Sequence, residues 1–400
     1  LDIEYDLLAK ESDIIDLHFW DRAFELLKRS DAVVLETEGK HKGCWVMKLE
    51  GSAEFEGMDE PDKILVRSNG TVTYTGKDIA YQLWKLGLLD RTFQYRKFWA
   101  YPDRHVLWET TSVDGSPDAP KFGNARRVYN VIDVRQSYLQ KVVNQGLRLL
   151  GYTREAENSI HFSYEMVALT PATAKALGIE ISEEDAKKSY IEMSGRKGLG
   201  VKADDLMDAL QSKATEAVGE GSKREGLSDG EVKTLGGQIA VGALRYFMLK
   251  YGRNKVIAFD FSEALTFEGD SGPYLQYSTV RVQNIFRKMA ERGVDARLDD
   301  ASLDALTLRE GITDEMWELV RRSAELPSAI RRGVEALELS IITHELFELS
   351  QKFNSFYHKY PILNESDPAE RQRRAACAEV FRRTMIAALD LLGIPVPQRM

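Results

Sequence analysis

The apolar pattern of the chain changes near residue 226, and this change limits the folds that the chain can adopt. Between residues 62 and 206, short β-rich runs alternate with helical segments, and an apolar run at 128–134 leads directly into a helix at 137–150. Beyond residue 226, apolar residues recur at helical spacing in several consecutive segments. Strand–loop–helix order predicts a buried, parallel sheet, whereas consecutive amphipathic helices with short connections predict a bundle. We therefore expect an α/β part followed by an all-α part.

The chain divides by pattern into residues 1–61, 62–225 and 226–400. The first part combines a helix at 14–28 with short strands such as 44–49. The second contains a strand pair at 64–74, a helix at 78–86 and, at its end, a glycine-rich linker at 218–226. The third opens on Ser228 and Glu231, which are spaced as a capping box at a helix start. Its later helices are expected at 275–292, 314–325, 329–349 and 370–392.

Charge and cysteine content exclude several classes of protein. The 400 residues include 54 Lys and Arg against 63 Asp and Glu, a formal net charge of -9, which excludes a globally basic nucleic-acid binder but not a local basic face. Cys44 and Cys377 lie far apart, without His or Cys at metal spacing, so we expect neither a disulfide framework nor a metal site. No apolar run reaches the ~20 residues needed to cross a bilayer. We expect a cytoplasmic protein without membrane contact.

Tyr74 and Asp78 lie four residues apart where a strand gives way to a helix. A carboxylate beside an aromatic ring can receive a guanidinium or ammonium group, but an aspartate near a helix start is commonly only a cap. Gln136 follows the apolar run at 128–134, where ligand-binding side chains collect on parallel sheets. It is equally well explained as a solvent-facing residue at the start of a helix.

The segment 193–198 reads MSGRKG. Small residues beside two adjacent cations can wrap an anion, although a short string of this kind is often only a surface turn. His161 begins another β-like run, and nothing at fixed spacing pairs with it. The metalloprotease, α/β-hydrolase, P-loop and dinucleotide-binding strings are absent from the sequence.

The helical part contains two features that could contact nucleic acid. Aromatic residues cluster at 353–360, where Phe353 and Phe356 are expected in the core. Tyr357 and Tyr360, with Lys359, could present rings to unstacked bases. Basic residues recur on the last helix. This pattern indicates either a solvated helix face or a strip that contacts phosphates. These basic residues are Arg371, Arg373, Arg374, Arg382 and Arg383.

Taken together, these strings resemble one family, the arginyl-tRNA synthetases of class I. The resemblance covers residues 67 to 400 and rests on an ordered set of runs rather than on one motif. The runs are RSNGTVTYTGKDIAY at 67–81, YNVIDVRQ at 129–136, MSGRKG at 193–198, GALRYFML at 242–249, FEGDSGPYLQY at 267–277, FNSFY at 353–357 and LGIPVPQRM at 392–400.

The resemblance implies a fold and a reaction. The fold is the second half of the Rossmann-like catalytic sheet, with residues 1–61 as an inserted α+β segment, followed by an α-helical anticodon-binding bundle. The reaction is that of an arginine–tRNA ligase, which uses ATP, expected with Mg²⁺, to join L-arginine to tRNA(Arg), and we expect a monomer.

The resemblance also assigns residues to each part of this reaction. Tyr74, Asp78 and Gln136 would bind arginine, and His161 would join the 193–197 loop at ATP. In that loop Met193, Ser194, Gly195, Arg196 and Lys197 would contact ATP, with Ser194, Arg196 and Lys197 taking the catalytic roles. In the bundle, the resemblance places Tyr357 and Met400 near positions that contact tRNA, and the basic pattern of the last helix adds Arg373 and Arg374.

Two departures from the family pattern qualify these expectations. The first class I signature, a His-x-Gly-His-like motif, is absent, and Glu192 and Gly195 stand where the general class I loop has lysines. We therefore expect the isolated chain to lack half of the catalytic domain and to be inactive alone. The alternative is a non-catalytic synthetase-like protein that binds tRNA or another partner. The segment from Arg91 to Lys121 matches no part of the family pattern.

Overall fold

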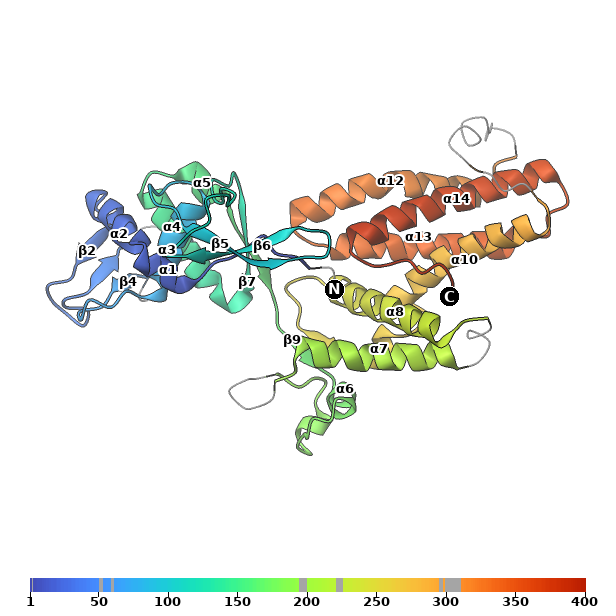
Figure 1. The fold of residues 1–400 in the computed structure, drawn as a ribbon, viewed down its shortest axis with the longest axis horizontal. Helices are drawn as coiled ribbons and strands as arrows, with labels where there is room; N and C mark the ends of the chain where they lie inside the picture. The colour runs from blue at the N-terminus through green and yellow to red at the C-terminus, as the bar shows by residue number, and fades with distance from the viewer. Residues whose placement is uncertain are drawn as a thin grey trace. The chain divides into compact units, whose positions relative to one another are not determined.

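The computed structural model describes residues 1, 3–49, 53–58, 61–193, 200–220, 226–294, 298 and 311–400. It forms two compact units (Figure 1), an N-terminal unit of residues 2–164 and a C-terminal unit of residues 165–400 together with Leu1. The prediction of an α/β part followed by an all-α part is confirmed. Division of the chain at residues 61 and 225 into functional parts stays a prediction.

The N-terminal unit mixes short strands with helices. In chain order its elements are β1 (Leu7–Leu8), α1 (Glu11–Asp16), α2 (Phe19–Arg29), β2 (Val33–Leu35), β3 (Trp45–Met47), η1 (Ala53–Phe55), β4 (Lys63–Val66), α3 (Tyr74–Lys85), β5 (Gln94–Ala100), β6 (Val106–Thr111), β7 (Val128–Asp133), η2 (Val134–Gln136), α4 (Ser137–Leu149), α5 (Thr153–Glu157) and β8 (Ser159–Tyr164). The described strands form three sheets, ordered β2-β3-β4, β1-β6-β5 and β7-β8.

Two predictions for this unit were wrong in detail. The single helix expected at 14–28 is two helices, because His18 adopts a left-handed backbone conformation, with φ of 58°, between α1 and α2. The run at 128–134 is parallel to β8 as expected, but it is not buried on both faces. Tyr129 and Val131 are 44% and 63% exposed, because the sheet among the described residues has only these two strands.

The core of the N-terminal unit lies between α2, α3, α4 and the β2-β3-β4 sheet. Phe19, Leu27, Leu65, Ile79 and Leu147 are fully buried there. Phe93, just before β5, joins the same core, and its ring centroid lies 4.3 Å from that of Phe19 and 4.8 Å from that of Trp84. The root of the β5–β6 hairpin is therefore fixed to helices α2 and α3.

The C-terminal unit is mostly helical. Its elements are β9 (Val167–Leu169), α6 (Pro171–Ala176), η3 (Asp185–Lys187), α7 (Ala203–Gly219), α8 (Asp229–Leu249), β10 (Ile257–Phe259), α9 (Phe261–Ala264), α10 (Gly272–Glu291), α12 (Asp314–Ala336), α13 (Ser340–Lys359) and α14 (Pro368–Leu391). Strands β9 and β10 pair in parallel. The capping box at Ser228 and Glu231 is confirmed, with both reciprocal hydrogen bonds present.

Two helix boundaries here differ from the sequence analysis. The two helices expected at 314–325 and 329–349 are α12 and α13, because Pro327 lies inside α12 without ending it. The interruption falls later, at Leu337, whose φ is 56°. Helix α7 extends to Gly219, so the start of the segment expected as a linker is helical, and residues 221–225 lie outside the described part.

Helix α8 packs very closely against the backbones of α7 and α10, and glycines lie at both contacts. A Cβ on Gly236 would come within 2.1 Å of Thr215 Oγ1 and 2.8 Å of its Cα on α7. A Cβ on Gly272, the first residue of α10, would come within 2.2 Å of the carbonyl oxygen of Gly242 on α8. Glycine therefore permits α8 to approach both neighbouring helices more closely than any side chain allows.

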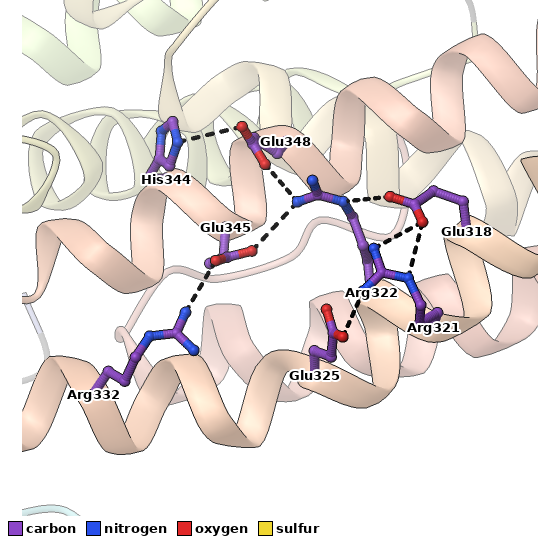
Figure 2. A network of polar contacts seen from close by, with 8 residues as sticks. All are labelled: Glu318, Arg321, Arg322, Glu325, Arg332, His344, Glu345 and Glu348. Atoms are coloured by element: carbon purple, nitrogen blue, oxygen red, sulfur yellow. Dashed lines mark hydrogen bonds and ion pairs between the residues drawn. The ribbon is translucent and has the colours of Figure 1, made fainter.

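Ion pairs join the exposed sides of α12 and α13, as Figure 2 shows. The guanidinium of Arg322 contacts Glu318 on its own helix and both Glu345 and Glu348 on α13. Arg332 also reaches Glu345, at 3.1 Å. In the described part of the chain, no helix is long and apolar enough to cross a membrane.

Candidate functional site

Helix α3 carries a row of aromatic and charged side chains on one face. Tyr74, Asp78, Tyr81 and Lys85 follow one another at spacings of four, three and four residues, which places them on the same side of a helix. Sequence reasoning found the first two. The same spacing rule applied onward from Tyr74 would also have found Tyr81 and Lys85.

Asp78 does not cap the helix. Helix α3 starts at Tyr74 with Thr73 as its N-cap, so Asp78 lies in the second turn, beyond the free backbone amides that a cap satisfies. The Thr73 hydroxyl donates to the carbonyl oxygens of Ile64 and Leu65 instead, at 3.0 and 3.2 Å. The structure therefore excludes the capping explanation of Asp78.

The Asp78 carboxylate has no hydrogen-bond or ion-pair partner among the described residues. Removal of water by the surrounding protein raises its pKa above the ordinary value, and the positive charges of Lys85 and Lys77 oppose that rise. Asp78 is nevertheless exposed, so its unpaired carboxylate is open to a cation that approaches it from solution. The nearby Lys77 is already engaged, since its ammonium lies 2.6 Å from Glu11.

Aromatic side chains flank this carboxylate. Tyr74 is 74% exposed, and the Lys77 ammonium lies 5.4 Å from the centre of its ring. Tyr81 is half-buried and stacks on Trp84 at 5.5 Å. A free carboxylate beside an open tyrosine ring is a receptor for a planar cation, because the carboxylate accepts two N–H bonds while the ring offers its face.

Lys85 closes the other end of the row. Its ammonium donates to Asn130 Oδ1 on β7 at 3.1 Å and lies 4.3 Å from the centre of the Tyr81 ring. Burial lowers the pKa of Lys85, and the charge of Asp78 works against that change. Lys85 thus links α3 to the β7–β8 sheet.

Gln136 ends the 3-10 turn η2 after β7 and is exposed. The turn is held by Asp133, whose carboxylate accepts from the backbone and guanidinium of Arg135. These bonds lower the pKa of Asp133 to about 2. Among the described contacts none joins Gln136 to Tyr74 or Asp78, so its part in the site stays a prediction.

His161 lies on β8 and is half-buried. Its Nε2 is 2.9 Å from the carbonyl oxygen of Ile132 on β7, a contact that holds the two strands together. This supports a structural task, and a contact with ATP stays a prediction. Met193 is half-buried against the apolar core around α7 and α8, whereas Ser194, Gly195, Arg196 and Lys197 lie outside the described residues.

Tyr357 lies on α13 beside an arginine. It stacks on the buried Phe353 with ring centroids 6.2 Å apart, and the guanidinium carbon of Arg281 lies 6.0 Å from the centre of its ring. Phe353 and Phe356 are buried, as predicted. Met400 is half-buried against the core around α7 and α8. Contacts of Tyr357 and Met400 with tRNA stay predictions.

The basic residues of α14 do not form a row of unpaired cations. Arg373 and Arg374 both contact Glu370, and Arg374 also reaches Glu365 at 2.7 Å. Arg382 and Arg383 share Glu379, which is 4% exposed. The sequence pattern of these arginines indicates either a solvated face or a strip that contacts phosphates. Neither interpretation includes their carboxylate partners, most of which lie three or four residues away on the same helix. Phosphate contact by Arg373 and Arg374 stays a prediction and requires that these pairs open.

No group of three or more His, Cys, Asp or Glu side chains within the described ranges is arranged to hold a metal ion.

Comparison with known proteins gives a consistent result. Residues 275–400 match the family of the DALR anticodon binding domain. The chain is 36% identical to the arginine–tRNA ligase of Thermococcus kodakarensis, with all of this chain and 58% of that protein aligned. It is 33% identical to the arginine–tRNA ligase of Deinococcus radiodurans, with all of this chain and 62% of that protein aligned.

Solved structures that resemble this chain include proteins of the same kind as these sequence relatives. The arginyl-tRNA synthetase of Thermus thermophilus matches with a TM-score of 0.78 at 30% identity, over 99% of this chain and 60% of that one. The arginyl-tRNA synthetase of Plasmodium falciparum matches with a TM-score of 0.69 at 17% identity, which shows the fold alone. The chain spans about three fifths of the length of the curated relatives it matches.

Proposed function

We propose that the chain is a part of an arginyl-tRNA synthetase and serves the arginine–tRNA ligase reaction, on the strength of its similarity to these enzymes. In that reaction ATP and L-arginine form arginyl-adenylate with release of pyrophosphate. The arginyl group then passes to tRNA(Arg) with release of AMP. The observation that carries the proposal is the unpartnered Asp78 carboxylate beside the exposed Tyr74 ring, on a chain with these relatives.

In this proposal the face of α3 binds the substrate guanidinium. Asp78 accepts two N–H bonds from it and Tyr74 covers it, while Lys85 stays bonded to Asn130 and leaves the carboxylate open. Gln136 helps to hold the amino acid. Asp78 is exposed, so a guanidinium can reach its carboxylate from solution and pair with it.

The remaining roles follow the family resemblance. Arg196 and Lys197, with Ser194, would stabilise the triphosphate as pyrophosphate leaves, an electrostatic role, and Met193, Gly195 and His161 would complete the ATP contacts. Mg²⁺ would enter with ATP. Residues 226–400 would bind the anticodon region of tRNA through Tyr357 and Met400, with Arg373 and Arg374 at phosphates, and residues 62–225 would hold the small substrates. We propose a cytoplasmic monomer.

A binding titration tests the arginine site without requiring catalysis. L-Arginine is compared with L-citrulline, which has the same shape and no charge. Hydrogen bonds to a charged group contribute about 1.5–3 kcal/mol, so we expect arginine to bind about 10- to 150-fold more tightly than citrulline. The variant Asp78→Asn should lose this preference.

Glu11→Gln is the matched control, since it removes a neighbouring carboxylate that is already paired with Lys77. It should keep the preference for arginine. An Asp78→Asn variant that still prefers arginine would place the guanidinium site elsewhere. A wild-type chain that binds neither arginine nor tRNA would contradict the proposed function.

A further inference from the structure

We propose that the tip of the β5–β6 hairpin is a stacking platform for unpaired nucleotides at the 3′ end of tRNA, with Phe98 and Trp99 as the platform. The inference rests on the proposed function and adds a contact that the family resemblance does not assign, because the segment 91–121 matched no part of the family pattern. In Figure 1 the two strands project as a narrow hairpin from the helices of the N-terminal unit.

The first observation is the exposure of two consecutive aromatic rings. Phe98 is 55% and Trp99 62% exposed. No other two consecutive aromatic residues in the described part of the chain are both exposed. Aromatic side chains normally supply a large share of a protein core, so two adjacent rings left in water at the end of a hairpin indicate a binding surface.

The second observation is the irregular pairing that presents these rings. Lys97 pairs with Trp108 and Trp99 with Leu107, so Phe98 is an extra residue in β5. Such a bulge breaks the regular alternation of side chains and re-aims them. The facing residues Leu107 and Trp108 are both 7% exposed. The opposite strand is therefore packed normally, and only the bulged strand leaves its rings open.

The third observation is that the hairpin is held at both ends. At its root Phe93 packs on Trp84 of α3, the helix that carries Asp78. At its tip His105 lies 2.9 Å from Asp6 and 3.3 Å from Glu4. A surface held in place in this way loses little conformational entropy when a ligand binds.

Charge identifies the kind of ligand. In a chain with a net charge of -9, residues 91–106 contain four basic residues, Arg91, Arg96, Lys97 and Arg104, and one acidic residue, Asp103. Arg96 and Lys97 pair with Glu109 and Asp118, but both cations remain more than half exposed. The Lys97–Asp118 pair is exposed on both sides, so it contributes little and can exchange for a phosphate, whereas Arg96 is held by a carboxylate that is only 9% exposed.

Arg91 and Arg104 have no ion pair among the described residues. Rings and cations together match single-stranded nucleic acid, whose bases stack while its phosphates are neutralised. The unpaired nucleotides of a tRNA with which this family reacts lie at its 3′ end, and the hairpin root packs on the helix of the proposed amino-acid site.

The test measures binding of a labelled single-stranded oligoribonucleotide that ends in CCA, and in parallel of a labelled anticodon stem-loop. Trp99→Ala and Phe98→Ala should each weaken binding of the CCA oligonucleotide by about 5- to 150-fold, the loss of one stacked base. Trp99→Phe keeps a ring and should retain most of the affinity. Trp317→Ala removes a tryptophan that is 57% exposed on α12, and it should leave the CCA oligonucleotide unaffected.

The two arms separate this inference from the proposed function. If the anticodon stem-loop binds and all four variants bind the CCA oligonucleotide like wild type, the platform is wrong while the proposed function stands. If neither RNA binds to the wild-type chain, both are wrong. If Trp99→Ala abolishes self-association in sedimentation and leaves RNA affinity unchanged, the rings bind a second copy and the proposal is overturned.

Discussion

Helices α8 and α10 pack closely at Gly272, which has no room for a side chain. Gly272→Ala adds a Cβ 2.2 Å from the Gly242 carbonyl oxygen and 3.0 Å from Cβ of Tyr246. Carbon and oxygen at that separation overlap strongly, since Cβ contacts under 3.0 Å are essentially never seen in proteins. The obstacle is backbone, so no side-chain rotation relieves it, and α8 and α10 must move apart by about 1 Å.

Overpacking of a well-packed contact costs about 1–3 kcal/mol, and a backbone obstacle places Gly272→Ala at the upper end. For a unit of this size, each kcal/mol lowers the melting temperature by about 2–4 °C. We therefore expect a fall of about 6–12 °C, measured by circular dichroism at 222 nm during heating and confirmed by urea unfolding.

The control is Gly230→Ala in the first turn of α8. A Cβ there meets no atom within 4 Å, and alanine is the better helix former by about 1 kcal/mol. This variant should melt at or slightly above the wild-type temperature. If Gly272→Ala melted with the wild type as well, the two helices could separate at no cost, and the reasoning from backbone contact would be refuted.

Three further predictions concern charge. Asp78→Asn should melt at or above the wild-type temperature at neutral pH. Asp78 is exposed, but loss of water around its carboxyl raises the folded pKa, so its charge reduces stability modestly as pH rises from the ordinary aspartate pKa to the raised one. A lower melting temperature would contradict this sign. Glu379→Gln should destabilise the chain by about 3 kcal/mol, since it leaves Arg382 and Arg383 without their shared carboxylate. Burial tends to raise the pKa of Glu379, but the two guanidinium groups outweigh it and lower the value. Its contribution should therefore be present above the ordinary glutamate pKa and disappear as pH falls below it, which urea unfolding across acidic pH measures. Arg322→Met should cost about 1 kcal/mol at low salt, and the difference from wild type should shrink in about 0.5 M NaCl because exposed pairs are screened. A difference independent of salt would mean that Arg322 acts through packing.

The features predicted correctly from the sequence, such as a helix cap and the buried face of a helix, depend on residues that lie close together in the chain. The Ser228 and Glu231 capping box was found at its position because both partners lie within one turn. Burial of Phe353 and Phe356 followed from helical spacing. The break in α12 was misplaced because Pro327 is tolerated inside the helix, while the left-handed residue Leu337, which carries no turn signal in its side chain, separates α12 from α13.

The site was harder to predict because its properties depend on neighbours. Whether Asp78 is a cap depended on where α3 begins, and a shift of four residues changed its chemistry. The cations of α14 looked free because a residue count does not show that Glu370 and Glu379 already pair with them. Exposure of Val131 could not be read from an apolar run, since it depends on how many strands the sheet contains.

The glycine contacts of α8 also have a mechanical consequence. Gln276 of α10 is fully buried, and its amide donates to the carbonyl oxygens of Gln238 on α8 and of Pro395 in the C-terminal tail. A Cβ on Gly242 would lie 2.5 Å from that same amide, so the amide has no room to turn. The C-terminal tail, α8 and α10 are therefore rigidly coupled through this amide. A displacement of the last residues should move α8 as a rigid body, because the side chains between them cannot rotate to accommodate it.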